Sequence, residues 1–194
     1  MNLRKAIDDL LPLVEKPSRY LGTEWNSVHK DPAAVQLRLC LFFPDLYELG
    51  LGNLGLHILY NILNGMDGVW AERTYTPAPD MERLLRERGL PLFLHESRDP
   101  VGAADAIGFS LQSELTFVNV LNGIDLAGFP VRSVDRAEDA PLFFAGGPAA
   151  YNPEPLAPFL DFFVIGDGEE AVVDIANALL LLRGAPRAKR LEAV

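Results

Sequence analysis

A nearly continuous apolar stretch, followed at once by a glycine-rich turn and an amphipathic helix, constrains this sequence most. Residues 34–43 read AVQLRLCLFF, and only Gln36 and Arg38 interrupt the apolar run. Such a run is typical of a parallel strand that is covered on both faces. Pro44 ends it, the turn DLYELGLGNLG follows, and apolar residues then recur at helical spacing from position 56 to 63. The unit predicted is strand, turn, helix.

The same alternation recurs along the chain. Further strands are predicted at 69–74, 106–111, 141–145 and 161–165, and further helices at 80–88, 114–126 and 169–183. We expect Asp80 to cap its helix and residues 91–97, PLFLHES, to form a short extended piece. The pattern predicts the α/β class: a doubly wound, flavodoxin-like or Rossmann-like parallel sheet of about five strands in the order 2-1-3-4-5, with helices on both faces.

The amino-terminal region differs from the rest because it lacks this alternation. Apolar residues at helical spacing predict a helix at 3–16, which Pro12 should kink or shorten. Residues 17–32 show no period and are interpreted as an arm that Tyr20 and Trp25 pin to the body. We therefore predict a helix and arm at 1–33, a main domain at 34–184, and a tail or linker at 185–194.

Charge and hydropathy exclude two classes of partner. The formal net charge is −10, whereas a nucleic-acid-binding protein needs a basic face. The only basic cluster, RGAPRAKR near the carboxyl terminus, is interpreted as a solvated end. No stretch approaches the roughly 20 apolar residues of a membrane-spanning helix, and acids and a proline replace the apolar core of a secretion signal. We expect a cytoplasmic protein with neither nucleic-acid nor membrane partners.

The cysteine and histidine content gives no sign of a metal site. Cys40 is the only cysteine, which excludes an internal disulfide and a thiolate-only site. It lies in the first strand and is interpreted as a small buried hydrophobe. His29, His57 and His95 are scattered and have no second ligand at helical spacing, so we predict structural roles for all three.

The candidate binding residues follow the predicted strands, because ligands of such sheets lie beyond the carboxyl ends of the strands. Small or polar residues stand there after the first, third, fourth and fifth strands. The candidates for cofactor binding are Asp45, Tyr47, Gly50 and Asn53, then Ser110 and Gln112, then Gly146, Gly147 and Pro148, and finally Gly166 and Asp167.

Two other kinds of site have weaker support. Gly50, Gly52 and Gly55 match the dinucleotide-binding pattern G-x-G-x-x-G. That pattern places its first glycine almost directly at the strand end, whereas six residues from Pro44 onward intervene here. The competing interpretation is that these glycines serve tight turns and close packing. No G-x-S-x-G nucleophile motif is present, and no catalytic residue is predicted in this chain.

Several long segments together resemble the cobalamin-binding-like domain at the amino terminus of uncharacterised radical SAM proteins. The segments are PDLYELGLGNLGLHILYNILN, GFSLQSELTFVNVLNGIDLAG and NPEPLAPFLDFFVIGDGEE. The resemblance covers roughly residues 15–182. It implies an accessory domain that binds cobalamin, with the partner being the protein's own radical SAM domain. The iron–sulfur cluster and S-adenosylmethionine would belong to that domain, which is absent here.

The sequence departs from the family pattern at two points. In the cobalamin motif D-x-H-x-x-G, Asp45 and Gly50 match, but Tyr47 stands where the histidine that ligates cobalt would be. A phenol is a poor cobalt ligand unless it is deprotonated, so cobalamin would bind without histidine ligation. With Cys40 alone, the chain also lacks the three cysteines that a radical SAM cluster needs.

Two hypotheses therefore remain open. In the first, the chain is an accessory domain that holds cobalamin and performs no catalysis of its own. In the second, it is a degenerate Rossmann-like module that docks or positions a substrate without cobalamin, with Tyr47 and the rings of Phe109, Phe143 and Phe144 filling the pocket. The oligomeric state is left open by the sequence.

Overall fold

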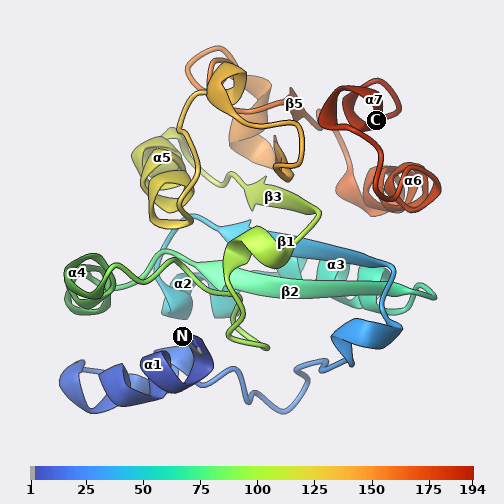
Figure 1. Cartoon of the computed structure of the whole chain (residues 1–194). Coiled ribbons are helices and arrows are strands. Elements are labelled where there is room, and N and C mark those ends of the chain that lie inside the picture. The colour runs from blue at the N-terminus through green and yellow to red at the C-terminus, as the bar shows by residue number, and fades with distance from the viewer. Residues whose placement is uncertain (1–2) are drawn as a thin grey trace.

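The computed structural model describes residues 3–194, and its centre is a five-stranded sheet in which all neighbouring strands run parallel (Figure 1). The spatial order is β2-β1-β3-β4-β5. The strands are β1 (Leu37–Phe43), β2 (Val69–Tyr75), β3 (Ala106–Ser110), β4 (Leu142–Gly146) and β5 (Phe162–Phe163). The predicted strand order is confirmed, and the topological switch point lies between β1 and β3. Residues 1 and 2 of the predicted amino-terminal helix and arm lie outside the described residues.

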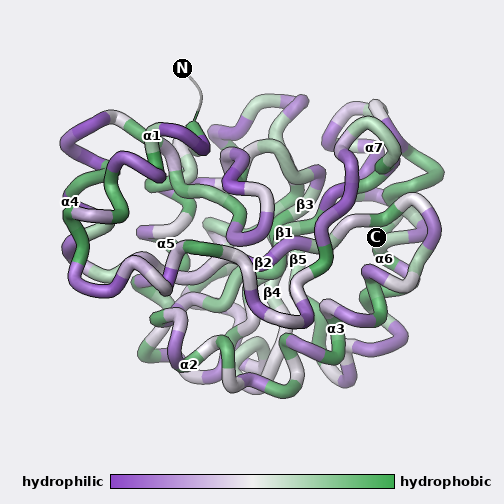
Figure 2. The backbone as a smooth tube through the Cα atoms, turned by 90° about the horizontal axis from the view of Figure 1, so that it is seen from below, coloured by the Kyte–Doolittle hydropathy of each residue, from purple (hydrophilic) through white to green (hydrophobic). Residues whose placement is uncertain are grey.

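Helices cover both faces of the sheet, as predicted. One face packs in a core cluster with α1 (Leu3–Leu10), α4 (Pro79–Arg88) and α5 (Phe117–Leu126). The other packs with α3 (Leu54–Asn64) and α6 (Gly168–Leu181). The short helices are α2 (Tyr47–Leu51) and α7 (Arg187–Leu191). Hydropathy alternates along the peripheral helices, as helices with one buried face require (Figure 2).

Strand alternation divides the apolar residues between these two clusters. Cys40 and Phe42 of β1 face the α4 and α5 side, whereas Leu39 and Leu41 face α3 and α6.

In the part of the chain that the structure describes, none of the helices combines the length and the apolar character that a bilayer crossing requires.

The start of α4 differs from the prediction. Ala78, not Asp80, is the N-cap residue, because Pro79 occupies the first helical position that its fixed backbone favours. The carboxylate of Asp80 instead accepts hydrogen bonds from the backbone N–H groups of Glu15, at 2.7 Å, and Met81, at 2.8 Å. Asp80 therefore ties the amino-terminal segment to α4.

The arm at residues 17–32 covers the edge strand β2, every residue of which is buried. Trp70 Nε1 donates to the carbonyl oxygen of Val28 at 3.0 Å, and the Val28 N–H donates to the Tyr60 hydroxyl at 2.7 Å. Covering an edge strand in this way removes a template for aggregation. Tyr20 is buried against Phe93, whereas Trp25 is fully exposed. The prediction that Trp25 pins the arm is therefore wrong.

Beneath the arm, charged side chains are buried on β2. The Glu96 carboxylate accepts hydrogen bonds from the Arg73 backbone N–H at 2.7 Å and from Arg73 Nε at 2.6 Å. Arg73 also donates to Glu24 and Ser27 of the arm. Glu96 belongs to residues 91–97, which are predicted as a short extended piece. In the structure these residues form a buried loop with one isolated β-bridge, between Phe93 and Pro100. This ion-pair cluster joins the arm, β2 and that loop.

Candidate functional site

A cavity of about 260 Å³ opens beside the topological switch point, between the sheet and the helices α3 and α6. Strand alternation turns Leu41 of β1, Gly108 and Ser110 of β3, and Phe144 and Gly146 of β4 toward this side of the sheet. The remainder of the wall comes mainly from the first turns of α3 and α6 and from the loops before them. Pockets for small ligands in open α/β sheets lie at this position.

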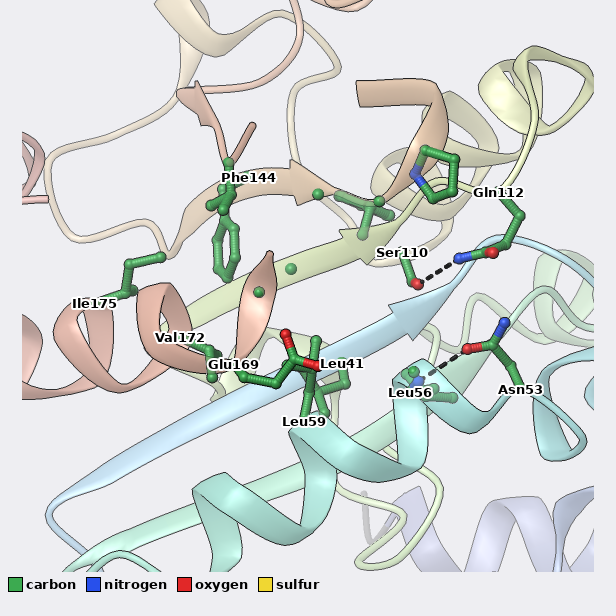
Figure 3. Close-up of a pocket in the computed structure, with 18 of the residues that line it drawn as sticks. Leu41, Asn53, Leu56, Leu59, Ser110, Gln112, Phe144, Glu169, Val172 and Ile175 are labelled. Atoms are coloured by element: carbon green, nitrogen blue, oxygen red, sulfur yellow. Dashed lines mark hydrogen bonds between the residues drawn. The ribbon is translucent and has the colours of Figure 1, made fainter. Parts of the chain in front are cut away.

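The wall of the cavity is apolar at one end and polar at the other (Figure 3). Phe144, Val172 and Ile175 lie toward the apolar end. At the other end, Ser110 accepts a hydrogen bond from Gln112 Nε2 at 3.0 Å, and Asn53 caps α3 by accepting from the Leu56 N–H at 2.8 Å. These neutral polar groups can orient a ligand without selecting for charge.

The absence of Cβ atoms makes room in the cavity wall. Glycines contribute to the wall from β3, β4 and the starts of α3 and α6. At Gly146 an added Cβ would lie 3.6 Å from Val164 Cβ, which is an ordinary contact distance, so the site accepts a side chain without backbone strain. Of the three predicted phenylalanine residues, Phe109 and Phe144 line the cavity. The ring of Phe144 packs over Gly108, where an added Cβ would meet it at 2.6 Å, and stacks on Phe162. The rings of Phe109 and Phe143 pack in the core cluster on the opposite face.

Seven of the eleven predicted binding residues line this cavity: Asn53, Ser110, Gln112, Gly146, Gly147, Pro148 and Gly166. Four do not: Asp45, Tyr47, Gly50 and Asp167. The residues that sequence reasoning missed include Gly55, Gly108, Phe144 and Glu169. Gly108 could have been found, because it is a glycine inside a strand and shares a face with Ser110.

Tyr47 lies outside the cavity and is held by the arm. Its hydroxyl donates to Glu24 Oε1 at 2.8 Å, and its ring packs against those of Tyr75 and His95. Burial, together with the hydrogen bond to the Glu24 carboxylate, raises the pKa of Tyr47 above its usual value of 10. The phenol stays protonated, is held by Glu24 and does not line the cavity, so we expect no contact with a ligand bound there.

Glu24 is the centre of this cluster, and its ionisation should be linked to stability. Burial alone would raise its pKa, but hydrogen bonds from His95, Ser27 and Tyr47 hold the pKa well below the ordinary 4.5. A carboxylate with a lowered pKa stabilises the fold above its ordinary pKa, and this contribution is lost as pH falls. We therefore expect Glu24→Gln to be less stable than the unmodified chain at pH 7, with the difference shrinking below pH 4.5.

Urea unfolding of both proteins at pH 7 and at about pH 3 checks this result. Burial raises the pKa values of Glu72 and Asp161, so these groups also make stability depend on pH. Both are present in the two proteins, and their contributions to the free energy of unfolding cancel in the comparison. A stability difference that stays constant between the two pH values would show that the Glu24 charge does not hold the arm.

Gly50 serves packing rather than phosphate binding. An added Cβ there would lie 2.5 Å from the Tyr75 ring and 2.9 Å from the Phe43 ring. Its N–H donates to the Leu46 carbonyl oxygen at 3.1 Å, and the N–H of Gly52 donates to the carbonyl oxygen of Gly50. Two of the three glycine amides of the G-x-G-x-x-G match are therefore used inside the turn. The competing interpretation, tight turns and packing, is the one the geometry favours.

Gly147 is required by its backbone. Its φ of 102° is in the region that favours glycine, and an added Cβ would lie 2.7 Å from the Leu111 carbonyl oxygen.

Asp45 and Asp167 are the remaining two predicted residues that do not line the cavity. Asp45 accepts a hydrogen bond from the Leu46 N–H at 2.7 Å. Asp167 is the N-cap residue of α6, but its side chain makes no capping hydrogen bond.

No group of three or more metal-ligating side chains occurs within residues 3–194. Cys40 is fully buried in β1, and burial raises the pKa of its thiol to about 12. A thiol in this state is neither a nucleophile nor a metal ligand at neutral pH.

Comparison with protein families finds a match that covers most of the chain. A family model described as radical SAM proteins, N-terminal, matches residues 55–194. No curated protein and no solved structure gives a significant match. The matched range includes α3 except its first residue, α6 and all the strands except β1, and so most of the cavity wall.

Proposed function

The chain belongs to the family of amino-terminal domains of radical SAM proteins, and we propose that it holds the nucleotide tail of a cobalamin in the glycine-lined cavity. The family implies a radical SAM domain elsewhere in the parent protein, for which this chain is an accessory domain. The observation that carries the proposal is the cavity at the switch point, where Gly146 leaves the wall open next to a neutral polar end.

The size of the cavity decides which part of the cofactor enters. Pockets that enclose a drug-sized ligand have volumes of roughly 300–1,000 Å³, and this cavity has about 260 Å³. A corrin ring with its side chains exceeds a drug-sized ligand. We infer that only the narrower nucleotide tail would enter the cavity, where Asn53 and Gln112 at the polar end would hold it.

The charges around the cavity favour this ligand over a dinucleotide. Glu169 is the charged residue in the wall, and no lysine or arginine lines it. A pyrophosphate with its two negative charges needs cationic or free amide partners, and the glycine amides at Gly50 and Gly52 are already used. Binding a tail that carries a single phosphodiester, next to neutral amides and hydroxyls, has a smaller electrostatic cost than binding a pyrophosphate.

Cobalt would have no imidazole ligand from this chain. His29, His57 and His95 make contacts elsewhere, with Gly22, Leu51 and Glu24 respectively, and none of them lines the cavity. Because Tyr47 does not line the cavity either, the protein's contribution would be to hold the tail, exclude water from it and position the corrin. When bound, cobalamin would supply methyl-transfer or redox chemistry to the radical SAM domain.

The test is to add hydroxocobalamin to the purified chain, desalt it, and record the visible spectrum. We expect a retained corrin spectrum at one equivalent per chain, with bands unlike those of a histidine-ligated cobalamin. Retention below a tenth of an equivalent, across a wide excess of cobalamin and also in the full-length parent, would exclude the proposal. The degenerate docking module would then be the better account.

A further inference from the structure

Exposed apolar side chains gather in the segments that leave the carboxyl ends of the strands. They are Leu49 and Leu54 after β1, Leu115 and Val118 after β3, Tyr151 after β4, and Ile165 after β5. Because all the strands are parallel, these segments share one edge of the sheet, which also holds the mouth of the cavity. We call residues 44–55, 110–118, 146–156 and 164–171 the rim. Apolar residues grouped in this way on a soluble domain mark an interaction site.

The rim is also strongly and exclusively acidic. None of the 17 lysines and arginines of the chain falls within these four segments. Seven carboxylates do: Asp45, Glu48, Glu114, Glu154, Asp167, Glu169 and Glu170. Five of them, all except Asp45 and Glu48, are exposed and make neither an ion pair nor a side-chain hydrogen bond within the described residues. A surface that combines apolar residues with unpaired charges of one sign is complementary to a basic, partly apolar surface.

The amino-terminal segment reaches the rim at Glu48, which pairs with Lys16 and Arg19, and at Tyr47, whose hydroxyl donates to Glu24. The apolar residues named above and the five unpaired carboxylates stay exposed. The arm lies over the edge strand β2. Helix α7 packs at the amino end of β4, where Arg190 donates to the carbonyl oxygens of Ala140 and Asp105. A second copy of this chain would bring one acidic rim against another, and the like charges would repel.

We propose that the rim docks a basic, partly apolar surface of the parent's radical SAM domain and that docking closes the mouth of the cavity. Glu169 belongs to both the rim and the cavity wall, so a domain seated on the rim also covers the cavity. The docking proposal rests on the family membership and on the charge of the rim, and it does not depend on cobalamin.

The test compares amide hydrogen exchange in the full-length parent and in this 194-residue chain, both without cobalamin. Peptides covering residues 112–119 and 164–171 are expected to exchange at least about tenfold more slowly in the parent, since docking removes their access to solvent. This protection should weaken at high salt, because the complementary charges are screened. Equal exchange in the two proteins would overturn the proposal. Protection that arises in the isolated chain and grows with its concentration would overturn it too, in favour of a second copy.

A matched pair of variants of the parent isolates the contribution of charge. Glu114→Lys with Glu154→Lys reverses two exposed rim carboxylates, and Asp139→Lys with Glu192→Lys makes the same change in charge away from the rim. The first pair should lose most of the protection and the second pair should keep it. Equal effects from both pairs would overturn the role of the rim. Because no cofactor is present, this result stands apart from the spectral test of cobalamin binding.

Discussion

Replacing Glu96 with alanine is expected to lower the free energy of unfolding by about 3–5 kcal/mol, the cost of leaving one member of a buried ion pair without its partner. The Glu96 side chain is 0% exposed and that of Arg73 is 1% exposed. Burial alone would lower the pKa of Arg73, but Glu96 and Glu24 hold the pKa above its usual value. In Glu96→Ala the guanidinium would stay charged and buried, with only Glu24 to compensate it. Urea unfolding followed by circular dichroism measures the change.

Two further variants show whether the loss comes from the uncompensated charge. Glu87 forms an exposed pair with Arg83 on α4, with both side chains more than half exposed. Glu87→Ala should therefore cost no more than about 0.5 kcal/mol. Arg73→Met combined with Glu96→Leu removes both charges and should be less destabilising than Glu96→Ala alone. If the double variant were the less stable of the two, the hydrogen bonds to the arm would matter more than the charge.

Placing a leucine at Gly146 is expected to raise the Kd for cobalamin by roughly 5- to 150-fold, because overfilling an occupied cavity costs about 1–3 kcal/mol. The backbone accepts the change, since an added Cβ meets Val164 at 3.6 Å. Gly147 is a poorer probe because its φ and its approach to the Leu111 carbonyl would strain any other residue. The Kd is measured by titrating the visible spectrum of hydroxocobalamin.

The control for Gly146→Leu is Gly52→Leu. Gly52 is exposed and does not line the cavity, and an added Cβ there would have no neighbour closer than 3.9 Å. This variant should bind cobalamin as the unmodified chain does. Unfolding curves of both variants show whether either change disturbs the fold. Equal binding by Gly146→Leu and the unmodified chain would place the tail outside the cavity, and a loss in both variants would indicate a general effect.

The sequence by itself determined the class of fold and the edge at which to look for a site. Apolar runs such as 34–43 and the strand-and-helix alternation are local patterns, and the preference for a right-handed crossover leaves few ways to assemble them. The order β2-β1-β3-β4-β5 follows. Glycines and small polar residues after the strands pointed to the carboxyl edge, and seven of the eleven candidates do share a cavity there.

Only the tertiary structure decided which strand-end residues face that cavity. Tyr47 follows β1, as the motif predicts, but Glu24 of the arm holds its hydroxyl outside the cavity. The burial of Arg73 on an edge strand likewise depends on Glu24 and Glu96, each at least 23 residues away. The physical reason is that periodicity reports the environment of a residue along its own element. The partners of a buried charge or phenol come from distant segments, whose positions are fixed only when the chain packs.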